Sequence, residues 1–320
     1  MSALSQQSLA AIKEADKMSA LQAKMSINQK EPKLSIVLAS QNARNSVADC
    51  LQTLENQGKS VDTEIIVVDN STDDTAEIIG REFPNVKLIN AAKEKLIPEL
   101  WGIGIEKSAG EYVALTTTHF VPSDDWIAET LLANEADYAG IGGAIENDAT
   151  AGIVSWAVYF CRYSPYMLPF DKAEVEDFAA DNASYKRRDL ELVKEAMSDG
   201  FWENFVHQKM RKADMKLLKT PRIVVYHRDS FTFWGFMNQR LQHGRQFGNT
   251  RAAQMPLATH LVYAALSPVI PFLYLYRIIG RVFAKKRNIG KLVLALPVLI
   301  LFLLSWSAGE FSGYLWKSEK

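Results

Sequence analysis

Residues 63–71 read TEIIVVDNS, an uninterrupted apolar run that ends in Asp69. A continuous apolar run is typical of a parallel strand covered on both faces, whereas a half-exposed strand alternates apolar and polar residues. In parallel sheets, ligands bind beyond the carboxyl ends of the strands. The stretch therefore predicts a buried parallel strand that places Asp69 at a ligand-binding edge. An Asx turn formed by the DNS sequence is the alternative role for Asp69.

The sequence on both sides repeats this pattern. Three more strand-like runs alternate with stretches whose apolar residues recur at helical spacing; they are residues 33–40 (KLSIVLAS), 86–90 (VKLIN) and 111–117 (EYVALTT). This alternation predicts an α/β fold, with a mostly parallel sheet and helices on both of its faces. The strand ends at Ser40, Asp69 and Thr117 should then share one edge of the sheet.

The second half of the chain is less regular. Small residues fill 139–147, and an aromatic stretch, WAVYFCRYSPYM, follows at 156–167. The spacing predicts an amphipathic helix over 200–218 and a last strand over 221–230 that contains His227. A basic, aromatic helix over 233–252 has the composition of a helix that lies in a membrane interface.

Bulk composition excludes several classes of protein. The 320 residues include 36 basic and 37 acidic side chains, a net charge of -1, so we expect no nucleic-acid partner. Two cysteines, Cys50 and Cys161, cannot form a disulfide framework. No cleavable signal peptide is recognisable at the N-terminus. No GxGxxG follows the first strand, which argues against a dinucleotide-binding oxidoreductase.

Two long stretches near the C-terminus, residues 252–276 and 292–309, contain no Asp, Glu, Lys or Arg. Each is about long enough to cross a hydrocarbon core of about 30 Å, and basic and aromatic residues flank both. Two buried core helices are the alternative. The predicted organisation is a mobile N-terminal arm, a catalytic domain, an interfacial helix and two membrane segments, with the boundaries 1–32, 33–230, 231–254 and 255–316.

The loop between the two apolar stretches raises a conflict. It holds six basic residues and no acid: Arg277, Arg281, Lys285, Lys286, Arg287 and Lys291. If the first stretch crossed the membrane, this loop would lie outside, against the positive-inside rule. A re-entrant or interfacial first stretch, broken at Pro268 and Pro271, would keep the loop inside. Because both stretches are long enough to span, we expect a two-helix hairpin.

The order of five motifs resembles the family 2 glycosyltransferases, which have the Rossmann-like GT-A fold. The motifs are LSIVLASQNARNSVADCLQTLENQ, EIIVVDNSTDDTAEII, GIEKSAGEYVAL, DNASYKRRDL and GFWENFVHQKMRKAD. The resemblance covers about residues 33–250 and extends to membrane-anchored bacterial members. It implies an inverting enzyme that transfers a sugar from a nucleotide diphosphate sugar, such as a UDP-sugar, to a lipid-linked or cell-envelope glycan acceptor at the cytoplasmic membrane face.

The same resemblance implies roles for individual residues. Glu203 matches the general base, with a solvated helical glutamate as the alternative. Asp181 and Asn182 match contacts to the sugar or the acceptor. Residues on the nucleotide-sugar side are Ala39, Ser40, Asp69, Lys95 and Thr118. Aromatic neighbours of Glu203 in the sequence should raise its pKa by desolvation, as a base requires.

The chain departs from the family where an acidic metal-binding motif is expected, because Thr116, Thr117 and Thr118 stand there. His119 and His227 could ligate Mn²⁺ and suit Mg²⁺ poorly, or they could be hydrogen-bonded histidines lining a cleft. Ser123 is the expected N-cap of the next helix, with Asp124 and Asp125 in its first turn; a metal role for these two acids is the alternative. If a metal is dispensable, arginines must stabilise the diphosphate, or they bind lipid headgroups instead; the candidates are Arg240, Arg245 and Arg251.

The missing acidic motif also motivates a second hypothesis. The chain would then be a catalytically impaired, nucleotide-binding subunit of a membrane glycan-assembly complex. Retention of Asp69 and Glu203 argues against this hypothesis. Either way, a donor made in the cytosol places the catalytic domain at the cytoplasmic side of the inner membrane.

Overall fold

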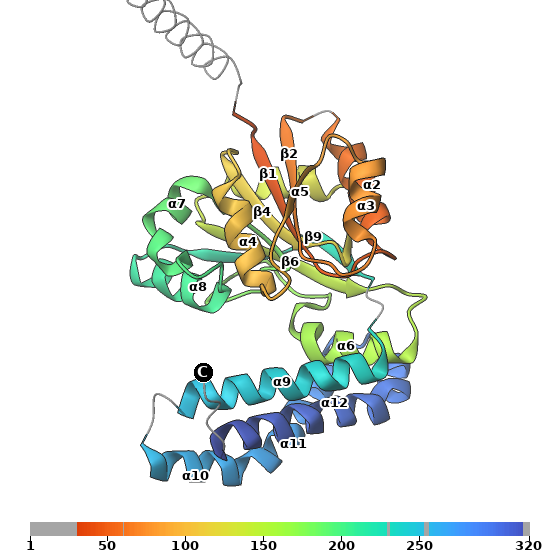
Figure 1. Ribbon diagram of the computed structural model, residues 1–320, viewed down its shortest axis with the longest axis vertical. Helices are drawn as coiled ribbons and strands as arrows, with labels where there is room; N and C mark the ends of the chain where they lie inside the picture. The colour runs from red at the N-terminus through yellow and green to blue at the C-terminus, as the bar shows by residue number, and fades with distance from the viewer. Residues whose placement is uncertain (1–30, 60, 229–230, 253–255, 316–320) are drawn as a thin grey trace, which may run out of the picture.

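The computed structural model, shown in Figure 1, describes residues 31–59, 61–228, 231–252 and 256–315. The predicted arm at residues 1–32 lies outside this range except for its last two residues. The described chain has two parts, an α/β part built on one nine-stranded sheet and a layer of helices beside it.

The first half of the sheet is parallel, as the apolar runs predicted. Its strands lie in the order β3-β2-β1-β4, and every pairing among them is parallel. These strands are β1 (Leu34–Ser40), β2 (Thr63–Asp69), β3 (Lys87–Asn90) and β4 (Tyr112–Thr117), and the helices between them are α2 (Val47–Gly58), α3 (Thr75–Glu82) and α4 (Ile97–Glu106).

The second half of the sheet is mixed. It continues β4-β8-β6-β9-β5, with β7 also paired to β9, and β8 is antiparallel to both of its neighbours. These strands are β5 (Phe120–Pro122), β6 (Gly140–Asn147), β7 (Ala173–Val175), β8 (Asn182–Lys186) and β9 (Leu217–His227). The small residues at 139–147 thus form an internal strand.

The predicted helix over 200–218 is wrong at its C-terminal end. Helix α8 (Glu203–Lys212) stops before Asp214, whose φ of 56° is left-handed. Leu217 and Leu218 belong to β9, where both are buried. The apolar residues at this boundary fit both the helical and the strand periodicity, so the turn at Asp214 determines where the helix ends.

Both faces of the sheet are covered, which confirms the α/β arrangement. One core joins Ile36 and Leu38 of β1 to α2, α3, α5 and α6. The other joins Val37 and Ala39 to α4, α7 and α8. The remaining helices of this part are α5 (Trp126–Asn134), α6 (Ile153–Tyr163), α7 (Arg187–Leu192) and the short turns Ser164–Tyr166 and Lys194–Met197.

The helical layer consists of α9 (Phe233–Ala252), α10 (Leu257–Leu266), α11 (Ile270–Lys285) and α12 (Ile289–Leu315). Within the described residues, two stretches are long and apolar enough to cross a membrane, Thr259–Lys285 and Ile289–Leu315. These helices run across the width of the α/β part and do not project away from it, and α6 lies between them and the sheet (Figure 1).

Helices α9 and α12 approach each other at glycines spaced four residues apart. A Cβ on Gly244 would overlap the carbonyl oxygen of Trp306, and one on Gly309 would overlap that of Leu241. Gly248 and Gly313 meet in the same way one turn later. Small residues at this spacing let two helix backbones pack closely, so α9 belongs to the layer as firmly as the apolar helices do.

The link between α11 and α12 docks on the α/β part. The Arg287 guanidinium lies 3.2 Å from the Glu146 carboxylate of β6. Lys285 donates to the carbonyl oxygen of Met167, and Lys291 donates to that of Ala149 at 3.4 Å. A hairpin that carried this link across a bilayer would separate those groups. These contacts are the ones that the interfacial alternative requires, and whether the first stretch crosses a bilayer stays a prediction.

Candidate functional site

The carboxyl ends of β1, β2 and β4 lie together, as the sequence predicted. Thr118 donates its hydroxyl hydrogen to Ser40 Oγ at 3.1 Å, and its backbone N–H donates to the carbonyl of Ala39. The backbone N–H of Asn70, directly after Asp69, donates to the carbonyl of Ser40 at 3.1 Å. Four of the predicted nucleotide-sugar residues therefore share one edge of the sheet.

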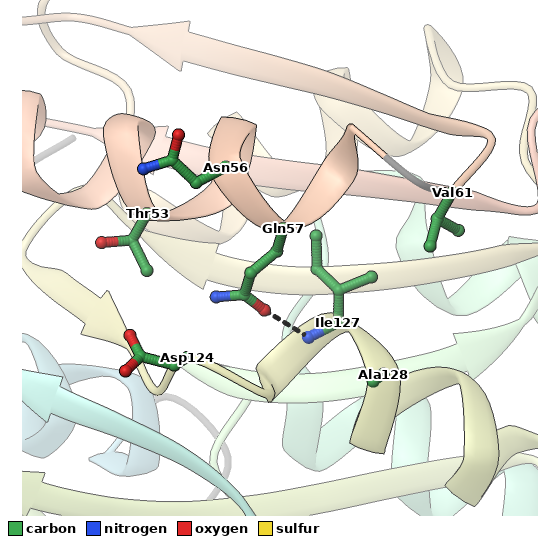
Figure 2. Close-up of a pocket in the computed structure, with 7 residues that line it drawn as sticks. All are labelled: Thr53, Asn56, Gln57, Val61, Asp124, Ile127 and Ala128. Carbon is green, nitrogen blue, oxygen red and sulfur yellow. Dashed lines mark hydrogen bonds between the residues drawn. The ribbon is translucent and has the colours of Figure 1, made fainter.

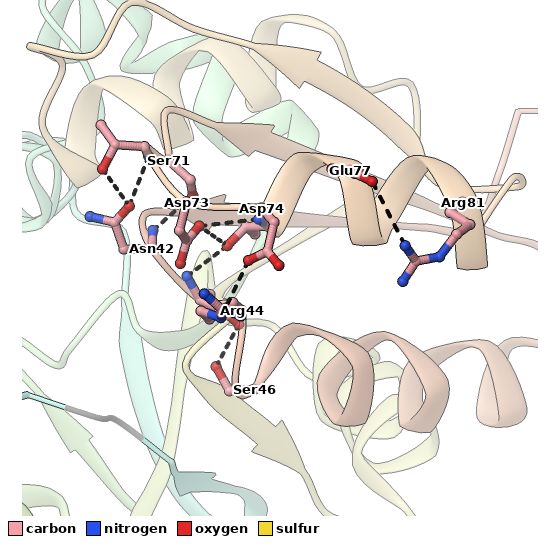
Figure 3. A network of polar contacts seen from close by, with 11 residues as sticks. Asn42, Arg44, Ser46, Ser71, Asp73, Asp74, Glu77 and Arg81 are labelled. Atoms are coloured by element: carbon pink, nitrogen blue, oxygen red, sulfur yellow. Dashed lines mark hydrogen bonds and ion pairs between the residues drawn. The ribbon is translucent and has the colours of Figure 1, made fainter.

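The loops after β1 and β2 are tied to each other by side chains (Figure 3). Ser71 Oγ accepts a hydrogen bond from the backbone N–H of Asn42 at 2.7 Å, and Asn42 Oδ1 accepts from that of Thr72 at 2.8 Å. Arg44 pairs with Asp74 at 3.3 Å across the same gap. These contacts hold the two strand ends in a fixed relation.

Asp69 and Lys95 belong to this edge but already have partners within the chain. The Asp69 carboxylate accepts from the hydroxyl of Ser71 at 2.6 Å and from its N–H at 3.1 Å, which is the Asx turn expected as an alternative. Asn70 donates to the carbonyl of Lys95 at 2.7 Å, while the Lys95 ammonium pairs with Glu99 at 3.0 Å. A nucleotide role for either side chain stays a prediction.

The threonine-rich stretch does not fit a divalent cation. Thr116, Thr117 and Thr118 are buried, and Thr118 is bonded to Ser40. His119 Nε2 lies 2.9 Å from the carbonyl of Gln41, and His227 Nδ1 lies 3.2 Å from Asn147 Oδ1. In the described ranges, no three His, Cys, Asp or Glu side chains gather where they could hold a metal ion.

Asp124 and Asp125 lie elsewhere, at the start of α5. The helix begins at Trp126 with Asp125 at the N-cap position, so the expected N-cap, Ser123, is wrong; its hydroxyl donates to Asp125 at 2.7 Å instead. Figure 2 shows Asp124 at a cavity of about 480 Å³ between α2 and α5. Gln57 ties the two helices by accepting from the N–H of Ile127 at 2.9 Å.

A different cavity, of about 320 Å³, contains Glu203 at the first residue of α8. It lies between the α/β part and the helical layer, because both contribute to its walls. Its polar lining comes mainly from α6, the start of β8, α8 and α9, and comprises Arg162, Tyr163, Tyr166, Asp181, Glu203 and Arg240. Its apolar wall comes from the layer and comprises Tyr274, Leu303 and Trp306.

Burial in this cavity raises the pKa of Glu203 to about 7, and the negative charge of Asp181 adds to the effect. The expected shift is therefore present, but the expected cause is only partly right. Phe201 is buried, whereas Phe205 is 64% exposed and cannot desolvate the carboxyl group. The non-local walls of the cavity provide the desolvation.

His207 fixes α8 one turn beyond Glu203. The imidazole is fully buried, with Nε2 2.8 Å from the hydroxyl of Tyr185 and Nδ1 hydrogen-bonded to the Asp177 carboxylate. Phe178 packs on the ring at 4.4 Å between centroids. A polar chain anchored on both sides sets the rotation of the helix and thereby the direction of Glu203.

The two residues expected to contact the sugar or the acceptor have different environments. The Asp181 carboxylate lines the cavity, accepts from the hydroxyl of Tyr163 at 3.2 Å and lies 4.0 Å from Arg162. Asn182 is fully buried, and its amide bonds to Trp126 Nε1, at 2.9 Å, and to the carbonyls of Ala144 and Ile223. Asn182 thus holds the sheet together, and only Asp181 remains a candidate contact.

The three candidate arginines also lie in different environments. Arg240 lies at the Glu203 cavity, with its guanidinium over the rings of Phe236 and Trp306 at 4.9 and 5.2 Å. Arg245 is exposed on α9 and does not line the cavity. Arg251 is held in the helical layer, where it bonds to Tyr314 at 3.2 Å and lies 3.9 Å from the buried Glu310.

Sequence reasoning missed Arg162, Tyr163 and Tyr166 as cavity residues, and His207 as an anchor. Their signal was present in part, because an arginine stands alone in the aromatic stretch at 156–167. Nothing local indicates that this stretch faces Glu203, about forty residues away in the sequence.

Residues 35–194, half of the chain, match the family described as Glycosyl transferase family 2. The chain belongs to glycosyl transferase family 2. The chain is also similar to the protein named "Putative glycosyltransferase EpsH" of Bacillus subtilis (strain 168). The two are 27% identical over 252 residues, which cover 77% of this chain and 61% of EpsH.

A solved structure agrees with this family fold. The chain is similar to the mannosyltransferase PcManGT from Pyrobaculum calidifontis in complex with GDP-Man and Mn²⁺, with a TM-score of 0.50 over 97% of each chain. At 15% sequence identity, the likeness concerns the fold, and it confirms the GT-A architecture.

Proposed function

We propose that this family 2 chain is an inverting glycosyltransferase. It moves a sugar from a nucleotide diphosphate sugar, with UDP as the first candidate nucleotide, to a lipid-linked or cell-envelope glycan acceptor. One observation carries the proposal: Glu203 lies in a desolvated cavity and has a pKa of about 7, which suits a general base near neutral pH.

In the proposed reaction, the ionised Glu203 takes the proton of the acceptor hydroxyl as its oxygen attacks the anomeric carbon of the donor. The bond from that carbon to the diphosphate breaks, and the electron pair leaves with the nucleoside diphosphate. Ser40, Asp69, Lys95 and Thr118 lie at the strand edge where we place the donor. No step passes through a metal ion, because the residues described there do not fit one.

We further propose that the helical layer lies along the cytoplasmic face of the membrane. Support comes from the course of its helices beside the α/β part and from their apolar exposed side chains, such as Phe272 at 68% and Tyr276 at 78%. In this arrangement, α9 is part of an interfacial assembly with α10, α11 and α12, and the catalytic part stays in the cytoplasm.

Calorimetric titration of UDP into purified protein, with Mn²⁺ and then with EDTA, tests the donor and the cation together. Equal binding in both media is the result we expect. Binding that needs Mn²⁺ and is lost in His119→Ala would instead make the TTTH stretch a metal site. No UDP binding in either medium would contradict UDP as the donor nucleotide.

A second candidate function is a nucleotide-binding subunit without transferase activity. The absence of a three-residue metal cluster in the described part of the chain favours it. Hydrolysis or transfer of a UDP-sugar by the wild type would exclude this candidate, whereas UDP binding with no turnover in the presence of membranes would support it.

A further inference from the structure

Two arginines line the Glu203 cavity, Arg162 from α6 and Arg240 from α9 of the helical layer. Arg240 is partly buried there, and burial lowers its pKa, while Cys161 opposes that effect and the nearby Arg162 adds a smaller lowering. Its Nε has no hydrogen-bond acceptor among the described residues, while its Nη2 lies 3.1 Å from His243 Nδ1. Arg162 faces the same cavity and lies 4.0 Å from Asp181. An anion between the two guanidinium groups would reduce their mutual repulsion and accept hydrogen bonds from both.

The geometry around Arg240 presents a prepared binding surface. Its guanidinium lies between the rings of Phe236 and Trp306, which fix the plane of the guanidinium. Arg162 stacks on Tyr163 at 5.0 Å and faces the same cavity. Planar, immobilised guanidinium groups lose little entropy when they bind phosphate oxygens.

The wall opposite the strand edge is apolar and opens toward the exposed side of the layer. Tyr274 lines the cavity and is 43% exposed, and its neighbour on α11, Leu273, is 54% exposed. These two exposed apolar side chains offer an alkyl chain a contact surface along α11 beside the cavity. A lipid phosphate can bury its alkyl chain on this wall, whereas a nucleotide can only stack its base on the aromatic rings, so the test below compares the two.

Glu203 limits what the acceptor can be. A phosphate monoester is already ionised at neutral pH and needs no base, and a carboxylate beside it would repel it. A sugar hydroxyl does need a base. The acceptor therefore carries two groups, a hydroxyl for Glu203 and an anion for the arginines.

We propose that the cavity binds a sugar attached to a lipid through a phosphate or diphosphate. This inference rests on the proposed function. Arg162 and Arg240 bind the phosphate, Tyr274, Leu303 and Trp306 contact the start of the lipid chain, and Glu203 accepts the proton of the sugar hydroxyl. The new bond joins that oxygen to the donor's anomeric carbon as the donor diphosphate leaves.

The test compares farnesyl diphosphate, farnesol and UDP as calorimetric probes of the full chain in detergent micelles. We expect farnesyl diphosphate to bind more tightly than farnesol. Arg240→Gln and Arg162→Gln should each weaken the binding of farnesyl diphosphate about 10- to 100-fold, the usual effect of losing a charged hydrogen bond. Neither variant should change the affinity for UDP. Arg245→Gln, on the same helix but outside the cavity, is the matched control.

Two results would overturn the inference. If the cavity variants weaken the binding of UDP and leave the binding of farnesyl diphosphate unchanged, the arginines bind the donor diphosphate. If neither cavity variant differs from Arg245→Gln while thermal unfolding shows both folded, the cavity has no anion site. Failure of the wild type to bind UDP would contradict the proposed donor separately, because the farnesyl diphosphate titration does not depend on it.

Discussion

Glu203 and His207 lie one turn apart on α8, and only His207 is locked on both sides, by Asp177 and Tyr185. Side chains four residues apart share a face of a helix. The locked imidazole therefore orients the helix, while Glu203 keeps a carboxylate available to the cavity.

Replacing the base should stop turnover without preventing donor binding. We expect Glu203→Gln to lower kcat by about 10²- to 10⁴-fold, because the amide cannot accept the hydroxyl proton. Donor turnover with membranes and UDP calorimetry measure the two effects. Glu195→Gln, the same change at an exposed glutamate paired with Lys209, is the control. A similar loss in both variants would show that Glu203 has no special role.

The activity should depend on pH through the same group. Because Glu203 must be ionised and its pKa is raised to about 7, kcat/KM should rise up to about pH 7 and level off above it. Removing the charge of Asp181 in Asp181→Asn should move the midpoint to lower pH. A midpoint that stays in place would mean that Asp181 does not act on Glu203.

The buried base should also cost stability at high pH. The ordinary pKa of 4.5 lies below the folded value of about 7, so the unfolded chain releases a proton that the folded chain keeps. The free energy of unfolding therefore falls as pH rises through this window. We expect Glu203→Gln to be about 1–2 kcal/mol more stable than wild type at pH 8, after allowance for partial exposure, and equal at pH 4. Denaturant titrations at both pH values check this, and a constant difference would contradict it.

The close approach of α9 and α12 should tolerate no added methyl group. Gly309→Ala would push a Cβ into the backbone of Leu241 and should destabilise the layer by about 1–3 kcal/mol. Gly280→Ala, at an exposed helical position with open space around it, should stabilise by about 0.5–1 kcal/mol. Thermal unfolding of the two variants measures the contrast, and equal effects would refute the packing.

The docked link should be reachable only from the cytoplasm. A cysteine in Gly290→Cys, where a Cβ meets nothing within 4 Å, should resist an impermeant maleimide in intact cells and react in inverted vesicles. The wild type measures the background from Cys50 and Cys161. Labelling from outside the cell would support the two-helix hairpin and contradict the interfacial arrangement.

The sequence predicted those parts of the fold whose signal is local. Continuous apolar runs predicted β1, β2 and β4, and the aromatic residues next to Glu203 in the sequence predicted that its pKa would be raised. Strand β6, GIGGAIEN, was not predicted from the sequence. Gly142 lies against the ring of Phe178, and this contact with a distant segment requires a small residue. The walls of the Glu203 cavity were not predicted for the same reason, because α6, α9 and α12 reach it only through tertiary packing.

The site was harder than the fold because residue type does not reveal what a side chain is already bonded to. Asn182 and Asp181 are adjacent in the sequence, yet one amide is saturated inside the sheet and one carboxylate faces a cavity. The proposed in-plane position of the layer was likewise not predictable, because length and apolarity are the same for a helix that crosses a bilayer and one that lies along it.

If the layer lies along the membrane as proposed, the course of α9, α11 and α12 across the α/β part has a mechanical consequence for the lipid. Helices that enter one leaflet widen that leaflet alone, so the two monolayers no longer match in area. A bilayer relieves this mismatch by bending away from the inserted side. The protein should therefore gather on small, strongly curved vesicles in preference to flat membranes of the same lipids.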